Sequence, residues 1–315
     1  MDTAERQRLA RVLAVIWVAG SISAYFYSAA KGVPAAVAIP VALAFLVEIS
    51  FYATLGTRAL RGPWVLAASG LASFLVYSVP TGVFSAKGLL LLAGLAAASA
   101  LWLRLLPGWL DAGYLAFVAG VYLLKLVREP YVEPLPDMKL GVSALGQLMW
   151  FRIGMASLLA ERDYGRMGFG FIPSAGEWRV GLRNFLLLLP SAAVVIWAVD
   201  FAHLRLAPGF WWKGPATFIG ILWVVALGEE AFFRGVLLER LRERAPVWLA
   251  VAVSSVVFGS VHLWFGDAFP NWKHAVVATV LGVFCARAYL AGPGIRAAMV
   301  THALAVTFWR VFLVS

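Results

Sequence analysis

The sequence has few of the residues that soluble proteins place on their surfaces. Only 13% of its 315 residues are charged and 62% are hydrophobic, whereas a soluble domain carries roughly 25% charged residues. A water-soluble fold of this length could not bury so much apolar side chain in one core, because much of any folded surface stays exposed. The composition therefore excludes an ordinary soluble globular fold and predicts an integral membrane protein.

Cysteine is almost absent. The single residue, Cys285, excludes a disulfide within the chain and a thiolate metal cluster. Because Cys285 lies inside an apolar run, we expect it to be a small buried apolar residue.

Acidic residues are also scarce, with 16 Asp and Glu against 26 Lys and Arg and a net charge of +10. The basic residues occupy short gaps between apolar runs and do not gather on one polar face. This distribution favours anchoring on the cytoplasmic side and contact with anionic lipid headgroups over nucleic-acid binding. If 247–265 and 273–291 both span, the basic run 240–244 and the pair Arg287 and Arg296 face the same side, expected to be the cytoplasm. Threading back from there puts the basic interval 128–183 on that side too, whereas counting five spans from a cytoplasmic N-terminus puts it outside, so the orientation stays open. The predicted partner is the lipid bilayer, and no nucleic acid.

Long apolar runs make up most of the sequence. A membrane-spanning helix needs about 20 mostly apolar residues, and ten segments approach that length. The expected fold class is therefore all-α, a polytopic integral membrane bundle of about ten apolar segments. They lie at 12–30, 34–56, 63–84, 88–103, 109–127, 184–202, 208–228, 247–265, 273–291 and 295–314.

The interval 128–183 is too polar and too rich in proline to span a membrane. Its stretch 140–160 is interrupted by Arg152, so we expect an amphipathic helix at the interface. The predicted organisation is N-terminal membrane helices at 1–127 with no assigned role, a polar linker at 128–183 and a functional core at 184–315.

Ionisable residues at membrane depth need an explanation, because each costs ~2.5–3.5 kcal/mol on insertion scales. The apolar run 227–235 contains Glu229, Glu230 and Arg234. Glu230 and Arg234 are four residues apart and share a helix face, whereas Glu229 is rotated by about 100° from Glu230. Arg234 would then hold Glu230 ionised and leave Glu229 available as a general base for water. The alternative is an ordinary ion pair at a helix end.

The next helix carries His262, which taken alone is more often structural than catalytic. Its expected depth in the membrane favours a catalytic role. Glu229 lies 16 residues before Ala245 and His262 lies 17 residues after it, so an antiparallel hairpin brings both to one level. A carboxylate and an imidazole at equal depth form a water-activating pair.

The remaining ionisable residues give weaker signals. His302 lies only about eight residues past the turn at Gly292–Gly294, so its depth fits less well, and taken alone it is expected to be structural. His203 and His274 lie near the ends of apolar runs and are expected at the interface. Glu48 is isolated in its segment and is expected to pair with another helix.

Three short motifs follow one another on successive predicted helices. They read Glu-Glu-Ala-Phe-Phe-Arg at 229–234, Phe-Gly-Ser-Val-His at 258–262 and His-Ala-Leu-Ala-Val at 302–306. In these motifs and in their order the chain resembles the CPBP family of intramembrane proteases, which includes the type II CAAX prenyl proteases and bacterial relatives. The resemblance covers roughly 184–315.

The resemblance implies an endopeptidase without a cofactor or metal, acting on a membrane-associated peptide or protein in a bacterial inner membrane. Glu229 with His262 would activate the water, His302 would help to stabilise the oxyanion, and Glu230 and Arg234 would order the site. The family processes prenylated C-termini, bacteriocin precursors or sorting tails, and the sequence does not choose among them.

One position departs from the family pattern. Val306 stands where the family usually has Asn or another polar residue. The loss of an oxyanion donor raises the barrier by ~2.7–4 kcal/mol. Either a neighbouring hydroxyl, from Thr301 or Thr307, replaces the donor, or the activity is weakened.

Two other function classes stay open at this stage. A zinc hydrolase could use Glu229, His262 and His302 as ligands, although the chain lacks a His-Glu-x-x-His helix. A non-enzymatic membrane scaffold or transporter would also carry buried ionisable residues.

Overall fold

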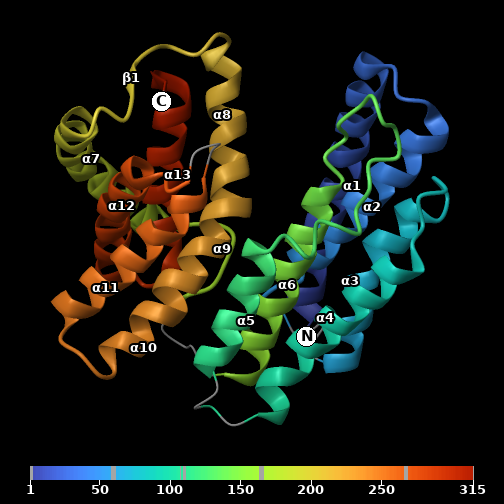
Figure 1. Ribbon diagram of the computed structural model, residues 1–315, viewed down its shortest axis with the longest axis horizontal. Helices are drawn as coiled ribbons and strands as arrows, with labels where there is room; N and C mark the ends of the chain where they lie inside the picture. Colours follow the sequence, from blue (N-terminus) through green and yellow to red (C-terminus); the bar gives the residue numbers. More distant parts are fainter. Residues whose placement is uncertain are drawn as a thin grey trace. The chain divides into compact units, whose positions relative to one another are not determined.

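The computed structural model describes residues 3–57, 62–106, 108, 111–162, 167–265 and 269–314. Helices make up most of the described chain (Figure 1). The chain divides into two compact units, Met1–Asp163 and Tyr164–Ser315. The division falls inside the interval 128–183, which contributes helix to both units.

The first unit is a bundle of six helices. They are α1 (Thr3–Lys31), α2 (Ala35–Ala53), α3 (Pro63–Ser78), α4 (Ala86–Leu105), α5 (Asp111–Leu123) and α6 (Ser143–Glu161). Helix α6 packs against α2, α3 and α4. Trp150 and Ile153 of α6 are buried in the apolar core of this unit.

The expectation of an interfacial helix at 140–160 was wrong. Arg152 of α6 is fully buried, and its Nε donates to Glu48 Oε1 of α2 at 2.6 Å. Its Nη1 also donates to Ser69 Oγ of α3 at 2.7 Å. Because Glu48 neutralises it, the arginine that interrupts the apolar run points into the bundle, and the expected partner of Glu48 is Arg152.

The second unit contains the motifs. It begins with α7 (Ala175–Ala198), whose first turn carries a capping box in which Ser174 Oγ accepts from the Glu177 N–H. A long helix follows from Phe210 to Arg242. Its parts are α8 (Phe210–Gly220), a π-helical stretch (Ile221–Ala226), α9 (Leu227–Glu230), a second π-helical stretch (Ala231–Leu238) and α10 (Glu239–Arg242).

Three further helices complete the second unit (Figure 1). They are α11 (Val247–Ser260), which ends in a 3-10 turn at Val261–Trp264, α12 (Trp272–Ala291) and α13 (Ile295–Phe312). Helix α13 packs against α7, α12 and the long helix. A two-residue strand, β1 (His203–Leu204), pairs antiparallel with β2 (Leu313–Val314).

One residue of the turn before α13 packs closely against another segment of the second unit. A Cβ at Gly294 would lie 2.5 Å from the Cα of Gly168, so this close approach of two backbones requires glycine. Ile295 and the alanines at 297 and 298 are fully buried, whereas Pro293 is exposed. The first turn of α13 is therefore packed inside the second unit, although the turn before it reaches the surface.

Seven of the described helices are long and apolar enough to cross a membrane, which confirms the all-α polytopic membrane class. The predicted count of about ten was approximate, because α3 and the apolar stretch Gly113–Leu123 of α5 are shorter and α13 falls outside the seven. The seven are Arg6–Lys31, Ala35–Ala53, Ala86–Leu105, Ala175–Ala198, Phe210–Arg242, Val247–Trp264 and Trp272–Ala291.

Candidate active site

The ion pair predicted from the first motif is present at the centre of the second unit. Glu230 and Arg234 are both 0% exposed, and Arg234 Nη1 lies 3.2 Å from the Glu230 carboxylate oxygens. Arg234 Nη2 donates to the Gly282 carbonyl oxygen at 2.9 Å, and the guanidinium lies 4.6 Å from the centroid of the Phe258 ring. Four groups on three helices thus hold one charge pair. The flanking π-helical stretches are of a kind often found at functional sites.

His302 lies between the two carboxylates. Its Nδ1 is 2.7 Å from Glu230 Oε1, and its Nε2 is 3.8 Å from Glu229 Oε2. The structure therefore brings together the histidine whose depth fitted least well and the acidic pair. The depth estimate counted residues from each turn as if the turns lay at one level, whereas the position of His302 depends on how α13 packs against α7 and the long helix.

His262 is oriented by its own helix. Its Nδ1 lies 2.8 Å from the Phe258 carbonyl oxygen, which can only accept, so Nδ1 carries the proton and Nε2 is free to accept one. The Phe258 ring lies between the two imidazoles, with centroids 4.9 Å from His262 and 5.7 Å from His302. Phe233 of the motif helix also contacts Phe258, at 5.0 Å between centroids. The hairpin thus aligns the two helices at the predicted level.

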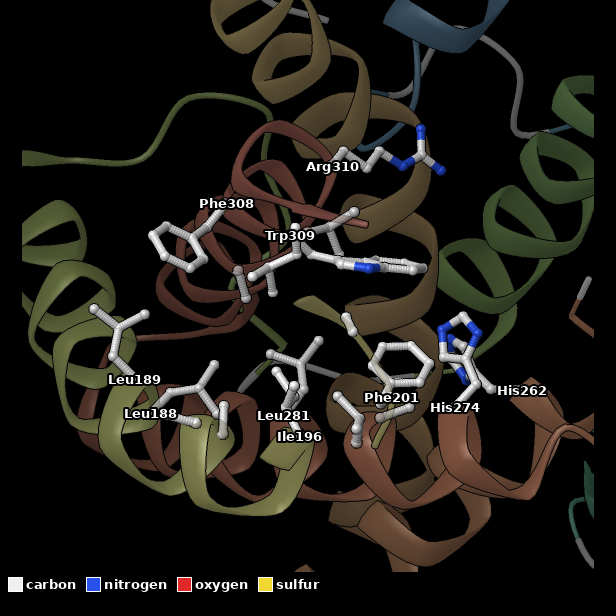
Figure 2. A pocket seen from close by; sticks show the side chains of 18 of the residues that line it. Leu188, Leu189, Ile196, Phe201, His262, His274, Leu281, Phe308, Trp309 and Arg310 are labelled. Atoms are coloured by element: carbon white, nitrogen blue, oxygen red, sulfur yellow. The ribbon is translucent and has the colours of Figure 1, made fainter. Parts of the chain in front are cut away.

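Glu229, His262 and His302 line one cavity of about 650 Å³. The Glu229 side chain is 26% exposed, whereas that of Glu230 is completely buried. Because the two side chains point in different directions from the helix, the Glu229 carboxylate reaches the cavity and the Glu230 carboxylate is enclosed by protein. The remaining wall is mostly apolar and comes from α7, the first π-helical stretch, α12 and α13, including Leu188, Ile196, Leu281 and Phe308 (Figure 2).

His274 is a site residue that the sequence did not indicate. It was expected at the interface, but its ring lines the same cavity, with its centroid 5.1 Å from that of His262 (Figure 2). It lies in the first turn of α12, which Asn271 caps by accepting from the His274 N–H. No periodicity or spacing relates His274 to the motifs, because its place depends on where α12 begins. His203 is exposed, lies 3.5 Å from Asp200 and also belongs to the lining of this cavity; its expected place at the membrane interface stays a prediction.

The wall beside His302 lacks the polar side chain expected there. Val306 lines the cavity. The Thr301 hydroxyl is buried and donates to the Gly181 carbonyl oxygen at 3.0 Å. Thr307 is not among the lining residues. Neither threonine is therefore placed to replace the donor missing at position 306.

The ligand atoms that cluster most tightly differ from the predicted zinc set. Among the described residues, those of Glu230, Cys285 and His302 lie within 4.8 Å of one another. The 2.7 Å between His302 Nδ1 and Glu230 Oε1 is shorter than the ~3.3 Å that separates two ligand atoms around a tetrahedral zinc ion with bonds near 2.0 Å. This geometry is that of a hydrogen bond, and Arg234 already supplies the positive charge.

The fold and the site define a polytopic membrane protein in which Glu229, His262 and His302 line one cavity and the buried Glu230 lies behind His302. Residues 210–308 match the family model described as type II CAAX prenyl endopeptidase Rce1-like. That segment contains all three motifs, so the resemblance drawn from them is confirmed, and at the level of the family it supports a protease of CAAX type. No curated protein and no solved structure matches the chain.

Proposed function

We propose that the protein is an intramembrane endopeptidase in which Glu229 and His262 activate a water molecule for attack on a peptide bond. The observation that carries this proposal is the convergence of Glu229, His262 and His302 on one cavity. All three belong to apolar helices, where ionisable side chains are costly and commonly mark function.

The reaction would proceed by addition and elimination. The water oxygen attacks the carbonyl carbon while Glu229 takes one of its protons, and His262 Nε2 accepts the second hydrogen bond of the water. The carbon–nitrogen bond then breaks, and the proton held by Glu229 passes to the leaving nitrogen. One peptide and one water yield one carboxylic acid and one amine. The cavity holds the reacting groups in a site with little bulk water.

The position of His302 between the two carboxylates supports its role. Because His302 Nδ1 donates to Glu230, Nε2–H is left to donate to the oxygen that becomes negative in the tetrahedral intermediate.

The cavity favours an apolar substrate segment. The lining of the cavity is mostly aliphatic and aromatic, so it would contact the apolar side chains of a membrane-associated peptide. The matching family acts on CAAX prenyl substrates by its description, and we extend that substrate class to this protein. We also place the protein in a bacterial inner membrane.

The test compares Glu229→Gln with wild type in detergent or lipid nanodiscs. The probe is a fluorogenic prenylated peptide that ends in Cys-aliphatic-aliphatic-X. Loss of a general base lowers kcat by about 10²–10⁴-fold, and we expect a loss in that range for Glu229→Gln with KM nearly unchanged. The matched control is Glu243→Gln, because Glu243 is exposed and pairs only with Arg240 among the described residues.

Equal cleavage by Glu229→Gln and wild type would remove Glu229 from the mechanism. Absence of cleavage by wild type would favour the scaffold or transporter.

A further inference from the structure

His274 occupies an unusual position for a histidine near a helix start. Its ring packs among aromatic rings, with centroid distances of 5.4 Å to Phe201, 5.0 Å to Trp309 and 5.5 Å to Phe265. The fourth neighbour is the imidazole of His262 (Figure 2). The ring thus lies in the cavity wall beside the proposed water-activating histidine.

The ring nitrogens of His274 lack a hydrogen-bond partner within the described ranges of the chain, since only its backbone N–H is bonded, to Asn271 Oδ1. The side chain is only partly buried and lines the cavity, so its ring nitrogens are available to water or to bound substrate there.

The proposed reaction leaves one donor position unfilled. His302 Nε2 is directed at the reacting region, but Val306 offers no hydrogen bond, Thr301 donates to the Gly181 carbonyl and Thr307 does not line the cavity. Oxyanion sites in acyl transfer commonly use more than one donor. Among the described residues that line the cavity, His274 has an imidazole without a hydrogen-bond partner in the protein, and its ring lies beside that of His262.

We propose that His274 is a further catalytic residue, which donates a ring N–H to the oxyanion in place of the polar side chain missing at position 306. The proposal rests on the proposed peptidase function. When water attacks, the carbonyl oxygen gains the negative charge and accepts from His274; when the carbon–nitrogen bond breaks, the carbonyl re-forms and the bond weakens. The proton stays on His274 throughout. A neutral imidazole has one N–H, so the role needs no buried positive charge.

The test compares two replacements of His274 by steady-state cleavage of the same fluorogenic prenylated peptide. His274→Phe keeps an aromatic ring between Phe201 and Trp309 and removes the donor, whereas His274→Gln keeps an N–H. Loss of one oxyanion donor lowers kcat by about 10²–10³-fold. We expect at least a 10²-fold loss for His274→Phe with KM nearly unchanged, and a smaller loss for His274→Gln. The control is Glu243→Gln, whose carboxylate is exposed, pairs with Arg240 and does not line the cavity.

A second variant tests the exchange of donors directly. Adding Val306→Asn to His274→Phe should recover a large part of kcat, because an amide N–H then reaches the cavity from the turn after His302. A kcat of His274→Phe within twofold of wild type would overturn the proposal, as would an equal loss in both His274 variants. If Glu229→Gln remains inactive in the same assay, only the role of His274 fails. If Glu229→Gln cleaves like wild type, the peptidase mechanism fails and His274 with it.

Discussion

At the scale of single residues, the arginine of the first motif has three tasks. Arg234 neutralises Glu230, donates to the Gly282 carbonyl oxygen and lies over the Phe258 ring. A guanidinium can serve several partners at once because its donors form a planar fork, whereas an ammonium is a point charge. The same residue thus couples the long helix to α11 and α12.

Removing this arginine should destabilise the second unit. Arg234→Leu leaves Glu230 buried without its compensating guanidinium, and breaking a buried pair costs about 3–5 kcal/mol. Arg234→Lys keeps the charge and should cost clearly less. Thermal unfolding in detergent, followed by tryptophan fluorescence, measures both. Equal melting temperatures for wild type and Arg234→Leu would contradict a structural role for the pair.

Metal removal separates the carboxylate mechanism from the zinc alternative. The short contact between His302 and Glu230 is a hydrogen bond, so we expect dialysis against EDTA or 1,10-phenanthroline to leave peptide cleavage unchanged. Elemental analysis of the purified protein provides a parallel measurement. Inhibition that added Zn²⁺ reverses would instead favour a metal hydrolase.

The residues of the site could be predicted to different extents. The division between Glu229 and Glu230 follows from their angular separation on one helix, and the position of His262 follows from equal distances to one turn. The position of His302 depends on how α13 packs against α7 and the long helix, which the spacing from its turn does not give. His274 belongs to no repeat or motif, and its contact with His262 depends on the 3-10 turn after α11 and on the first residue of α12.

At the scale of elements, α6 carries the chain's second buried ion pair, in the first unit. Arg152 and Glu48 are both completely buried, and Arg152 is also bonded to Ser69. The pattern of α6 alone suggested an interfacial helix because its arginine interrupts an apolar run. Its partner lies on α2, 104 residues earlier, and local periodicity carries no information about so distant a contact.

The pair predicts a strongly non-additive double-mutant cycle. Arg152→Leu leaves an unpaired carboxylate in an apolar bundle and should destabilise the first unit by about 3–5 kcal/mol. Adding Glu48→Leu should recover most of that loss, because two apolar side chains leave no buried charge. Denaturation of the full chain in detergent gives the coupling energy. Additive effects would show that the two residues act independently.

At the scale of the whole molecule, the candidate active site belongs to only one of the two units. All three motifs lie in the second unit, as does the segment that matches the endopeptidase family. The sequence correctly predicted a helical membrane protein from composition alone. It overestimated the number of spans, because apolar runs of 63–84 and 109–127 contain shorter helices, Pro63–Ser78 and Asp111–Leu123.

The spans of the second unit make a prediction about membrane sidedness. Phe210–Arg242 and Val247–Trp264 are consecutive spans, so the residues between them should face the side opposite to the segment that precedes Phe210. The run 240–244 is basic and should face the cytoplasm. Glu243→Cys should therefore react with an impermeant maleimide from the cytoplasmic side alone, and His203→Cys from the other side alone.

The single native cysteine makes this measurement clean. Cys285 is buried, so the wild-type protein should stay unlabelled until it is unfolded in SDS, and it serves as the matched control in intact cells and in inverted vesicles. Labelling of Glu243→Cys and His203→Cys from the same side would mean that Phe210–Arg242 does not cross the bilayer. Glu229 would then lie outside the hydrocarbon region, and the argument that a carboxylate at membrane depth must be functional would lose its basis.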